Sequence, residues 1–144
     1  MTTAADSISL GRKARNERNF PEAREHYAAA AAIYHDQNEY LAYAHTIRHI
    51  ADIHVEESQD ESSLHDARPL YEEALEIYRS SLSTKLLDLA NTVRPYALLL
   101  EIQGDQSAAK PLWEEARNLY ASLRLDVGVT ECNRHLSQLQ QSGH

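Results

Sequence analysis

The residues of this chain that could bind a metal are concentrated in one short stretch, where His45, His49 and Asp52 follow one another at helical spacing. Residues three and four positions apart lie on one face of a helix, so these side chains could offer a metal ion two nitrogens and an oxygen. Such spacing arises easily in a chain with eight histidines, and a metal site needs converging geometry that spacing alone does not show. We therefore expect no bound metal and no other cofactor.

Sequence motifs of catalysis are missing from the chain. It contains no glycine-rich phosphate loop, no nucleophile elbow and no paired-cysteine zinc pattern. Its single cysteine, Cys132, cannot form an internal disulfide, and it lies on the apolar stripe of a helix expected near the C-terminus. That position is typical of a small core residue rather than a nucleophile. We therefore expect no catalytic residues and a protein that is not an enzyme.

Arginines recur at equivalent places in three predicted helices. The segments 46–53, 92–99 and 132–139 align with one another and bring Arg48, Arg94 and Arg134 into register. Guanidinium groups bind carboxylates through paired hydrogen bonds, so this strip predicts recognition of an acidic or carboxylate-terminated peptide. The alternative is that the arginines lie over apolar surface, or pair with Asp52 and Glu101, and are simply solvated. The sequence leaves both interpretations open.

A repeated segment positions these helices. Its three copies are Ala23–Tyr34, Ala67–Tyr78 and Ala109–Tyr120, which begin 44 (67 minus 23) and 42 (109 minus 67) residues apart. In each copy two alanines and two aromatic residues alternate at positions i, i+4, i+7 and i+11, on one continuous helical face. We expect this face to pack against neighbouring helices and to make no direct contact with a ligand. A repeat of this length predicts a helical solenoid.

The pattern predicts a polar tail, seven helices and one loop-like insertion. We expect residues 1–6 to form a flexible tail, Ser7 to cap the first helix, and Gln59 to Ser63 to form the insertion. Gly104 should end the fifth helix and Asp105 should cap the sixth. The expected single domain is 7–144, with repeats at about 7–36, 39–81 and 84–124 and a capping helix at about 126–141.

The helical segments resemble tetratricopeptide repeats. Leu10-Gly11 matches the first half of the family signature, with Ala14 in place of a tyrosine, and Ala23-x-x-x-Tyr27 and Ala109-x-x-x-Trp113 match the second half. The period of about 42 residues is longer than usual and is similar to that of kinesin light chains. The resemblance covers about residues 7–141 and implies an all-α, right-handed solenoid of three helix pairs plus a C-terminal capping helix.

The family also implies an interaction scaffold, in which the first helix of each pair lines a concave groove that holds a peptide or a partner segment. Chaperone-tail binders of the family hold a terminal carboxylate with basic groove residues, but Pro95 stands here where a basic residue is wanted, so that activity is not carried over. The alternative function is a self-associating structural subunit, such as a homodimer. The candidate groove residues are Arg12, Arg15, Asn16, His45, Arg48, His49, Asp52, Asn91, Arg94, Leu98, Glu101, Arg134 and Gln138.

Composition limits the partners and the location. The net charge of −8 argues against non-specific binding to nucleic acid or to an anionic membrane surface. No stretch approaches 18 apolar residues, and the N-terminus has no apolar run typical of a signal peptide. We therefore expect a cytoplasmic protein whose partner is another protein or a peptide.

Overall fold

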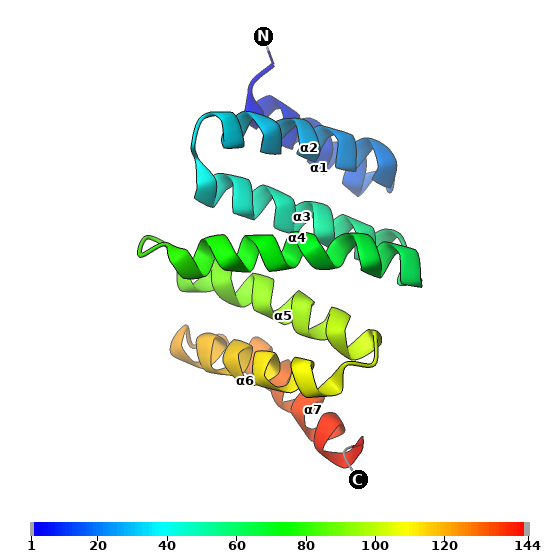
Figure 1. Ribbon diagram of the computed structural model, residues 1–144, viewed down its shortest axis with the longest axis vertical. Coiled ribbons are helices and arrows are strands. Elements are labelled where there is room, and N and C mark those ends of the chain that lie inside the picture. Colours follow the sequence, from blue (N-terminus) through cyan, green and yellow to red (C-terminus); the bar gives the residue numbers. More distant parts are fainter. Residues whose placement is uncertain (1, 143–144) are drawn as a thin grey trace. The chain divides into compact units, whose positions relative to one another are not determined.

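The computed structural model describes residues 2–142 and folds them into seven α-helices without a β-strand (Figure 1). None of these helices is long and apolar enough to cross a membrane. Met1, in the expected tail, and Gly143 and His144, at the end of the expected domain, lie outside the described residues. The helices are α1 (Ala4–Asn16), α2 (Phe20–Asp36), α3 (Tyr40–Glu57), α4 (Glu61–Ser80), α5 (Leu86–Ile102), α6 (Gln106–Ser122) and α7 (Asp126–Ser142).

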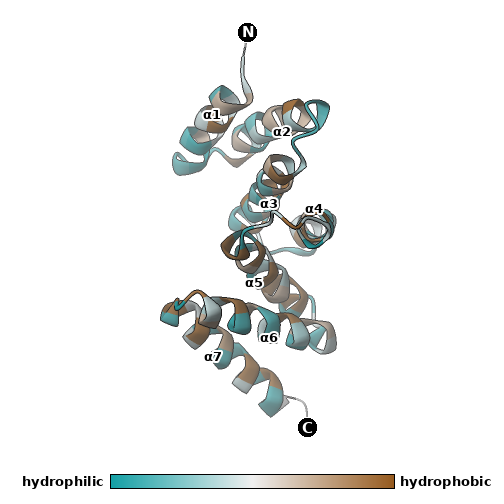
Figure 2. Cartoon of the chain, turned by 90° about the vertical axis from the view of Figure 1, so that its left-hand side faces the viewer, coloured by the Kyte–Doolittle hydropathy of each residue, from teal (hydrophilic) through white to brown (hydrophobic). Residues whose placement is uncertain are grey.

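The helices form two compact units, Met1–Ser81 and Leu82–His144. In the first unit α1 packs on α2, α2 on α3 and α3 on α4, and in the second α5 packs on α6 and α6 on α7. Each helix carries both hydrophobic and hydrophilic residues, as helices do when they bury one face (Figure 2). The all-α class and the packing of neighbours in the sequence are therefore confirmed.

The first helix begins earlier than the sequence predicts. Thr3 rather than Ser7 is its cap, because the Thr3 hydroxyl accepts a hydrogen bond from the Asp6 amide and the Asp6 carboxylate accepts one from the Thr3 amide, each at 3.1 Å. This reciprocal pair is a capping box, which starts the helix at Ala4. Ser7 is buried inside the helix, and the expected tail to residue 6 is wrong in its second half.

The expected insertion between α3 and α4 is also shorter than predicted. The Asp60 carboxylate accepts a hydrogen bond from the Ser63 amide at 2.8 Å and caps α4, so Glu61 to Ser63 are helical. As a result, α4 has 20 residues, and Pro69 lies inside it. Pro95 lies inside α5, which continues through it to Ile102.

The repeated face forms the core, as expected. The two alanines that each copy contributes to this face are buried, and so are its aromatic residues with the exception of Tyr34, which is half-buried. Trp113 is fully buried and Tyr71 is 1% exposed. These residues hold adjacent helices together.

The two turns that join α1, α2 and α3 recur between α5, α6 and α7 at a constant offset of 86 residues, the separation of Ala23 and Ala109 (109 minus 23). The helix α2 ends at Asp36 and α6 at Ser122. In the first turn Arg18 and Gly104 both adopt left-handed backbone, with φ of 61° and 86°. The second turn repeats this with Asn38 and Arg124, at 59° and 58°. The expected roles of Gly104 and Asp105 are confirmed, since Asp105 also accepts a hydrogen bond from the Ala108 amide.

Candidate functional site

In the first unit the predicted groove residues of α1 and α3 bind mostly to one another and to their neighbours. Arg15 donates to Glu56 through Nε at 2.9 Å and again through Nη2. Arg48 donates to Asp52 at 3.2 Å, and the Tyr71 hydroxyl donates to the other carboxylate oxygen at 2.5 Å. Burial outweighs these partners and raises the pKa of Asp52. These charges are therefore matched within the unit.

His49 of α3 lies between Arg15 and His45 and is neutral. Arg15 can only donate, so its contact with His49 Nδ1 at 3.1 Å makes that nitrogen an acceptor. The proton of His49 then lies on Nε2, which faces His45 Nε2 at 3.1 Å. Burial, followed by the charge of Arg48 and of other basic neighbours, lowers the pKa of His49 to about 3.

This arrangement disfavours the metal site that the histidine spacing suggested. A metal held by both Nε2 atoms would displace the one proton of His49 while Arg15 still donates to Nδ1. The ring would become an imidazolate, and the added cation would lie near Arg12, Arg15 and Arg48, whose charges all act on His49. In the described part of the chain, no group of three or more His, Cys, Asp or Glu side chains is placed to hold a metal.

Two other predicted residues of this unit are exposed. Arg12 and Asn16 lie on α1, and neither forms an ion pair or a side-chain hydrogen bond with a described residue. The seven candidates of the first unit therefore comprise two hydrogen-bonded groups and two exposed residues on α1. One group is Arg15, His49 and His45, and the other is Arg48 and Asp52.

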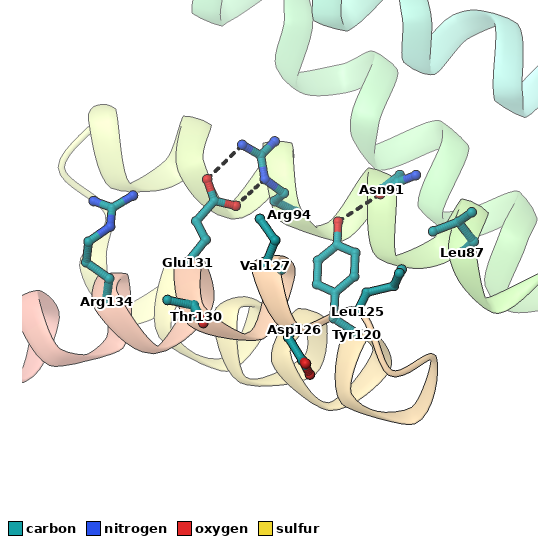
Figure 3. A pocket seen from close by; sticks show the side chains of 11 residues that line it. Leu87, Asn91, Arg94, Tyr120, Leu125, Asp126, Val127, Thr130, Glu131 and Arg134 are labelled. Atoms are coloured by element: carbon teal, nitrogen blue, oxygen red, sulfur yellow. Dashed lines mark hydrogen bonds and ion pairs between the residues drawn. The ribbon is translucent and has the colours of Figure 1, made fainter.

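In the second unit α5, α6 and α7 enclose an open pocket of about 750 Å³ (Figure 3). Three predicted groove residues line it, namely Asn91, Arg94 and Arg134. Leu98 on α5 is half-buried and Gln138 on α7 is exposed, and neither lines the pocket. The full lining is Leu87, Asn91, Arg94, Tyr120, Leu125, Asp126, Val127, Gly128, Thr130, Glu131 and Arg134.

Tyr120 and Gly128 form a close contact in the pocket wall. A Cβ atom at Gly128 would lie 2.6 Å from Cγ of the Tyr120 ring, so only glycine allows this approach. The Tyr120 hydroxyl donates to Asn91 Oδ1 at 2.8 Å. The amide nitrogen of Asn91 is therefore turned away from the tyrosine, as Figure 3 shows, and remains a hydrogen-bond donor.

One end of the pocket is apolar and open to solvent. Leu87 is 44% exposed, Leu125 41% and Val127 87%. Leu87 comes from the start of α5, and Leu125 and Val127 come from the residues at the start of α7. Figure 3 shows Leu87 and Leu125 on one side of Tyr120, Val127 between Tyr120 and Glu131, and Arg134 at the opposite side. Exposed apolar side chains that gather at a pocket are a common feature of interaction sites.

The other end is charged. Arg94 of α5 donates to both carboxylate oxygens of Glu131 on α7, with Nη2 and Oε2 at 2.8 Å. The pKa of Glu131 is lowered, chiefly by this hydrogen bonding and then by the charges of Arg94, His135 and Arg134. Arg134 is exposed and forms no ion pair with a described residue. The three aligned arginines thus differ, because Arg48 pairs with Asp52, as the alternative interpretation predicted, whereas Arg94 pairs with Glu131 and not with Glu101.

Glu101 has a different partner. His135 Nδ1 lies 3.1 Å from each carboxylate oxygen of Glu101, and the imidazole stacks on Trp113 with ring centroids 4.0 Å apart and an interplanar angle of 5°. Beside this cluster Cys132 is buried, and burial raises the pKa of its thiol to about 11. A protonated thiol is a poor nucleophile, which agrees with the core role predicted for Cys132.

Sequence reasoning missed several residues of the pocket. Tyr120 was assigned to packing alone, yet it also lines the pocket. Leu125 and Val127 are apolar residues at the start of a predicted helix, and they lie outside its apolar stripe. Apolar residues outside the stripe were the only sign in the sequence that this helix start could line a site. The contribution of Leu87 depends on α5 and α7 starting at the same end of the unit, which no local pattern reveals.

A scan against models of known protein families finds no match to this chain, and a search of curated proteins finds no similar sequence.

Proposed function

We propose that this chain is a non-enzymatic interaction scaffold of the tetratricopeptide-repeat type, and that the pocket between α5 and α7 binds a segment of a partner protein. In this proposal α1–α2, α3–α4 and α5–α6 are the three helix pairs of a solenoid and α7 is its cap. The observation that carries it is the open pocket, which combines three exposed apolar side chains with an amide donor and two arginines. Its volume lies within the range of about 300–1,000 Å³ typical of ligand sites.

The chemistry of the pocket favours binding over catalysis. The Tyr120 hydroxyl donates to Asn91, and Glu131 is held by Arg94. The nearby Cys132 is buried, with a raised pKa. The groups that remain exposed can make apolar contacts, donate hydrogen bonds or bind a carboxylate, which are the interactions that a peptide requires.

Polar residues of α7 at positions that are buried in α3 support its role as a terminal cap. At the 86-residue offset, Ala44, Ile47 and Ala51 of α3 are buried, whereas their α7 equivalents are polar and exposed. Those equivalents are Thr130, Asn133 and Ser137. A polar face of this kind is what the last helix of a repeat stack needs in water, and it counts against self-association through this face of α7.

The internal ion pairs limit the places on the arginine strip where an acidic peptide could bind. In the first unit Arg48 and Asp52 form an enclosed ion pair, with side chains 12% and 17% exposed, so Arg48 is poorly placed to bind an acidic ligand. The pocket of the second unit is the better supported site.

A displayed library of random peptides, selected in parallel on three purified proteins, tests the proposal. The natural chain and an Asn133→Asp control, which adds one negative charge on α7 outside the pocket, should enrich the same peptides. A Val127→Asp variant, which adds that charge at the apolar rim, should not enrich them. If no peptide depends on Val127, the proposal is wrong.

Mass measurements in solution at several concentrations examine the self-association alternative. A mass that rises with concentration for the natural chain but not for Val127→Asp would mean that a second copy occupies the pocket. A constant monomer mass is expected.

A further inference from the structure

We infer that the partner segment carries a carboxylate and that Glu131 holds the place of this carboxylate in the free protein. The segment places an apolar side chain against Leu87, Leu125 and Val127, and its carboxylate at Arg94 and Arg134. This inference rests on the function proposed above, since it names the chemistry of the pocket's occupant.

Glu131 occupies the position that a bound carboxylate would take. It accepts two hydrogen bonds from the Arg94 guanidinium, the bidentate arrangement that arginine also forms with carboxylates of other molecules. The positive charge of Arg134, one helical turn further along α7, also lowers the pKa of this carboxylate. Both arginines line the pocket together with Glu131 (Figure 3).

This ion pair is part-exposed and lines the pocket, so it is accessible to a ligand bound there. The side chains of Arg94 and Glu131 are 38% and 25% exposed, so a ligand can reach them from the pocket. The pair of Arg48 and Asp52 in the first unit is more enclosed, at 12% and 17%, and Tyr71 also holds Asp52. Exchange of one carboxylate for another at Arg94 would leave its pairing intact, and Glu131 could then turn towards Arg134 or water.

The positions along α7 set the spacing of the two recognised groups. Val127 and Arg134 lie seven residues apart (134 minus 127), which is about 10 Å along a helix. An extended segment covers that length in about three residues. Asp126 lies beside Val127, and its negative charge disfavours a carboxylate at the apolar end. The acidic group of the partner therefore belongs at the Arg134 end.

The test uses a peptide from the library selection, with its affinity measured by fluorescence anisotropy. Arg134→Glu should weaken binding by about tenfold or more, because it replaces a charge-assisted hydrogen bond by repulsion. Glu131→Gln should strengthen binding about two- to fivefold, since it removes a competitor held by a part-exposed ion pair. Two matched substitutions on α6 outside the pocket, Lys110→Glu and Glu114→Gln, should leave the affinity unchanged. Thermal unfolding of each variant checks that the fold is retained.

The outcomes separate this inference from the function on which it rests. The inference requires both effects, and it fails if either variant matches its control or if Glu131→Gln weakens binding. In that case a peptide that still depends on Val127 leaves the proposed scaffold function standing. If no peptide depends on Val127, the proposed function and the inference fail together.

Discussion

The helices α1–α3 and α5–α7 place a histidine against an aromatic ring in the same way. In the first triplet His49 of α3 stacks on Tyr27 of α2, with ring centroids 5.7 Å apart. In the second, His135 of α7 stacks on Trp113 of α6 at 4.0 Å. Each residue and its counterpart are 86 positions apart (135 minus 49, and 113 minus 27). The same packing of three helices therefore occurs twice in this chain.

The third partner of each stack has the opposite charge. Arg15 of α1 donates to Nδ1 of His49, whereas Glu101 of α5 accepts from Nδ1 of His135. His49 must therefore carry its proton on Nε2, and His135 carries a proton on Nδ1. The histidine and aromatic residues at equivalent positions determine the packing of both triplets. The third residue, Arg15 in one and Glu101 in the other, determines which ring nitrogen of the histidine carries a proton.

The pocket arises from a similar change of residue type at matched positions. Arg94 corresponds to Ile8, which packs against the hydrophobic core of the first unit. Its partner Glu131 corresponds to His45. The same position therefore packs against the core in the first triplet and forms an ion pair between α5 and α7 in the second.

The largest effect is expected from removing the aromatic ring of each stack. Trp113→Ala should lower the free energy of unfolding by about 3–5 kcal/mol, and Tyr27→Ala should cost somewhat less because the ring is smaller and 3% exposed. Denaturant unfolding measures both values, and amide exchange should show the loss of protection mainly in the triplet that contains the change. A cost below about 1 kcal/mol for Trp113→Ala would mean that the ring is not part of a close-packed core.

Acid should destabilise the first triplet through His49. The pKa of His49 is lowered to about 3 in the fold, while an unfolded chain has a histidine pKa near 6.5. Below that value the unfolded state binds the extra proton, so stability present above about pH 6.5 is lost as pH falls towards 3, by up to about 1.4 kcal/mol per pH unit.

The variant His49→Gln, which can still accept from Arg15, isolates this effect. As the pH falls from 6.5 to 4, the unfolding free energy of the natural chain should decrease relative to that of the variant. The raised pKa of Asp52 acts in the opposite direction, but it largely cancels in the difference if the variant leaves Asp52 unperturbed. Parallel curves would show that His49 does not titrate as the structure implies.

Two glycines test how closely each triplet is packed. A Cβ at Gly128 would lie 2.6 Å from Cγ of Tyr120, and one at Gly11 would lie 2.8 Å from Cδ2 of Tyr27. Overpacking of this kind costs about 1–3 kcal/mol, and Gly128→Ala should cost more because Cγ is the fixed root of its ring. Thermal unfolding compares the two variants. Equal, negligible costs would mean that both rings can move aside.

Much of the fold could be predicted from the sequence because it is repeated and periodic. The Ala-aromatic face located α2, α4 and α6, and Gly104 and Asp105 located the turn between α5 and α6. The start of α1 was missed because its capping box at Thr3 and Asp6 lies outside the repeat.

The candidate site could be predicted only in part, because its partners come from different helices. The register of the arginines was readable, but Arg94 pairs with a residue 37 positions away rather than with Glu101 on its own helix. The choice depends on the lateral offset of α5 against α7, which is set by the packing of both on α6. Local spacing carries no information on that offset.

The smallest effects are expected at the turns, where the triplets use different residues in the same left-handed backbone. Gly104, at φ 86°, has no atom within 4 Å of an added Cβ, so Gly104→Ala tests backbone strain alone and should cost about 0.5–1 kcal/mol. Its counterpart Arg18 pays the same strain, yet its guanidinium carbon lies 5.0 Å from the centroid of the Phe20 ring.

The reverse substitutions then separate strain from that cation–π contact. Arg124→Gly relieves strain at φ 58° and should raise stability by about 0.5–1 kcal/mol. Arg18→Gly relieves similar strain but loses a contact worth about 0.5–1 kcal/mol, so its net effect should be close to zero. Denaturant unfolding of both variants measures the difference. If Arg18→Gly stabilises the chain as much as Arg124→Gly does, the contact with Phe20 contributes nothing, and the two turns differ only in which residue bears the strain.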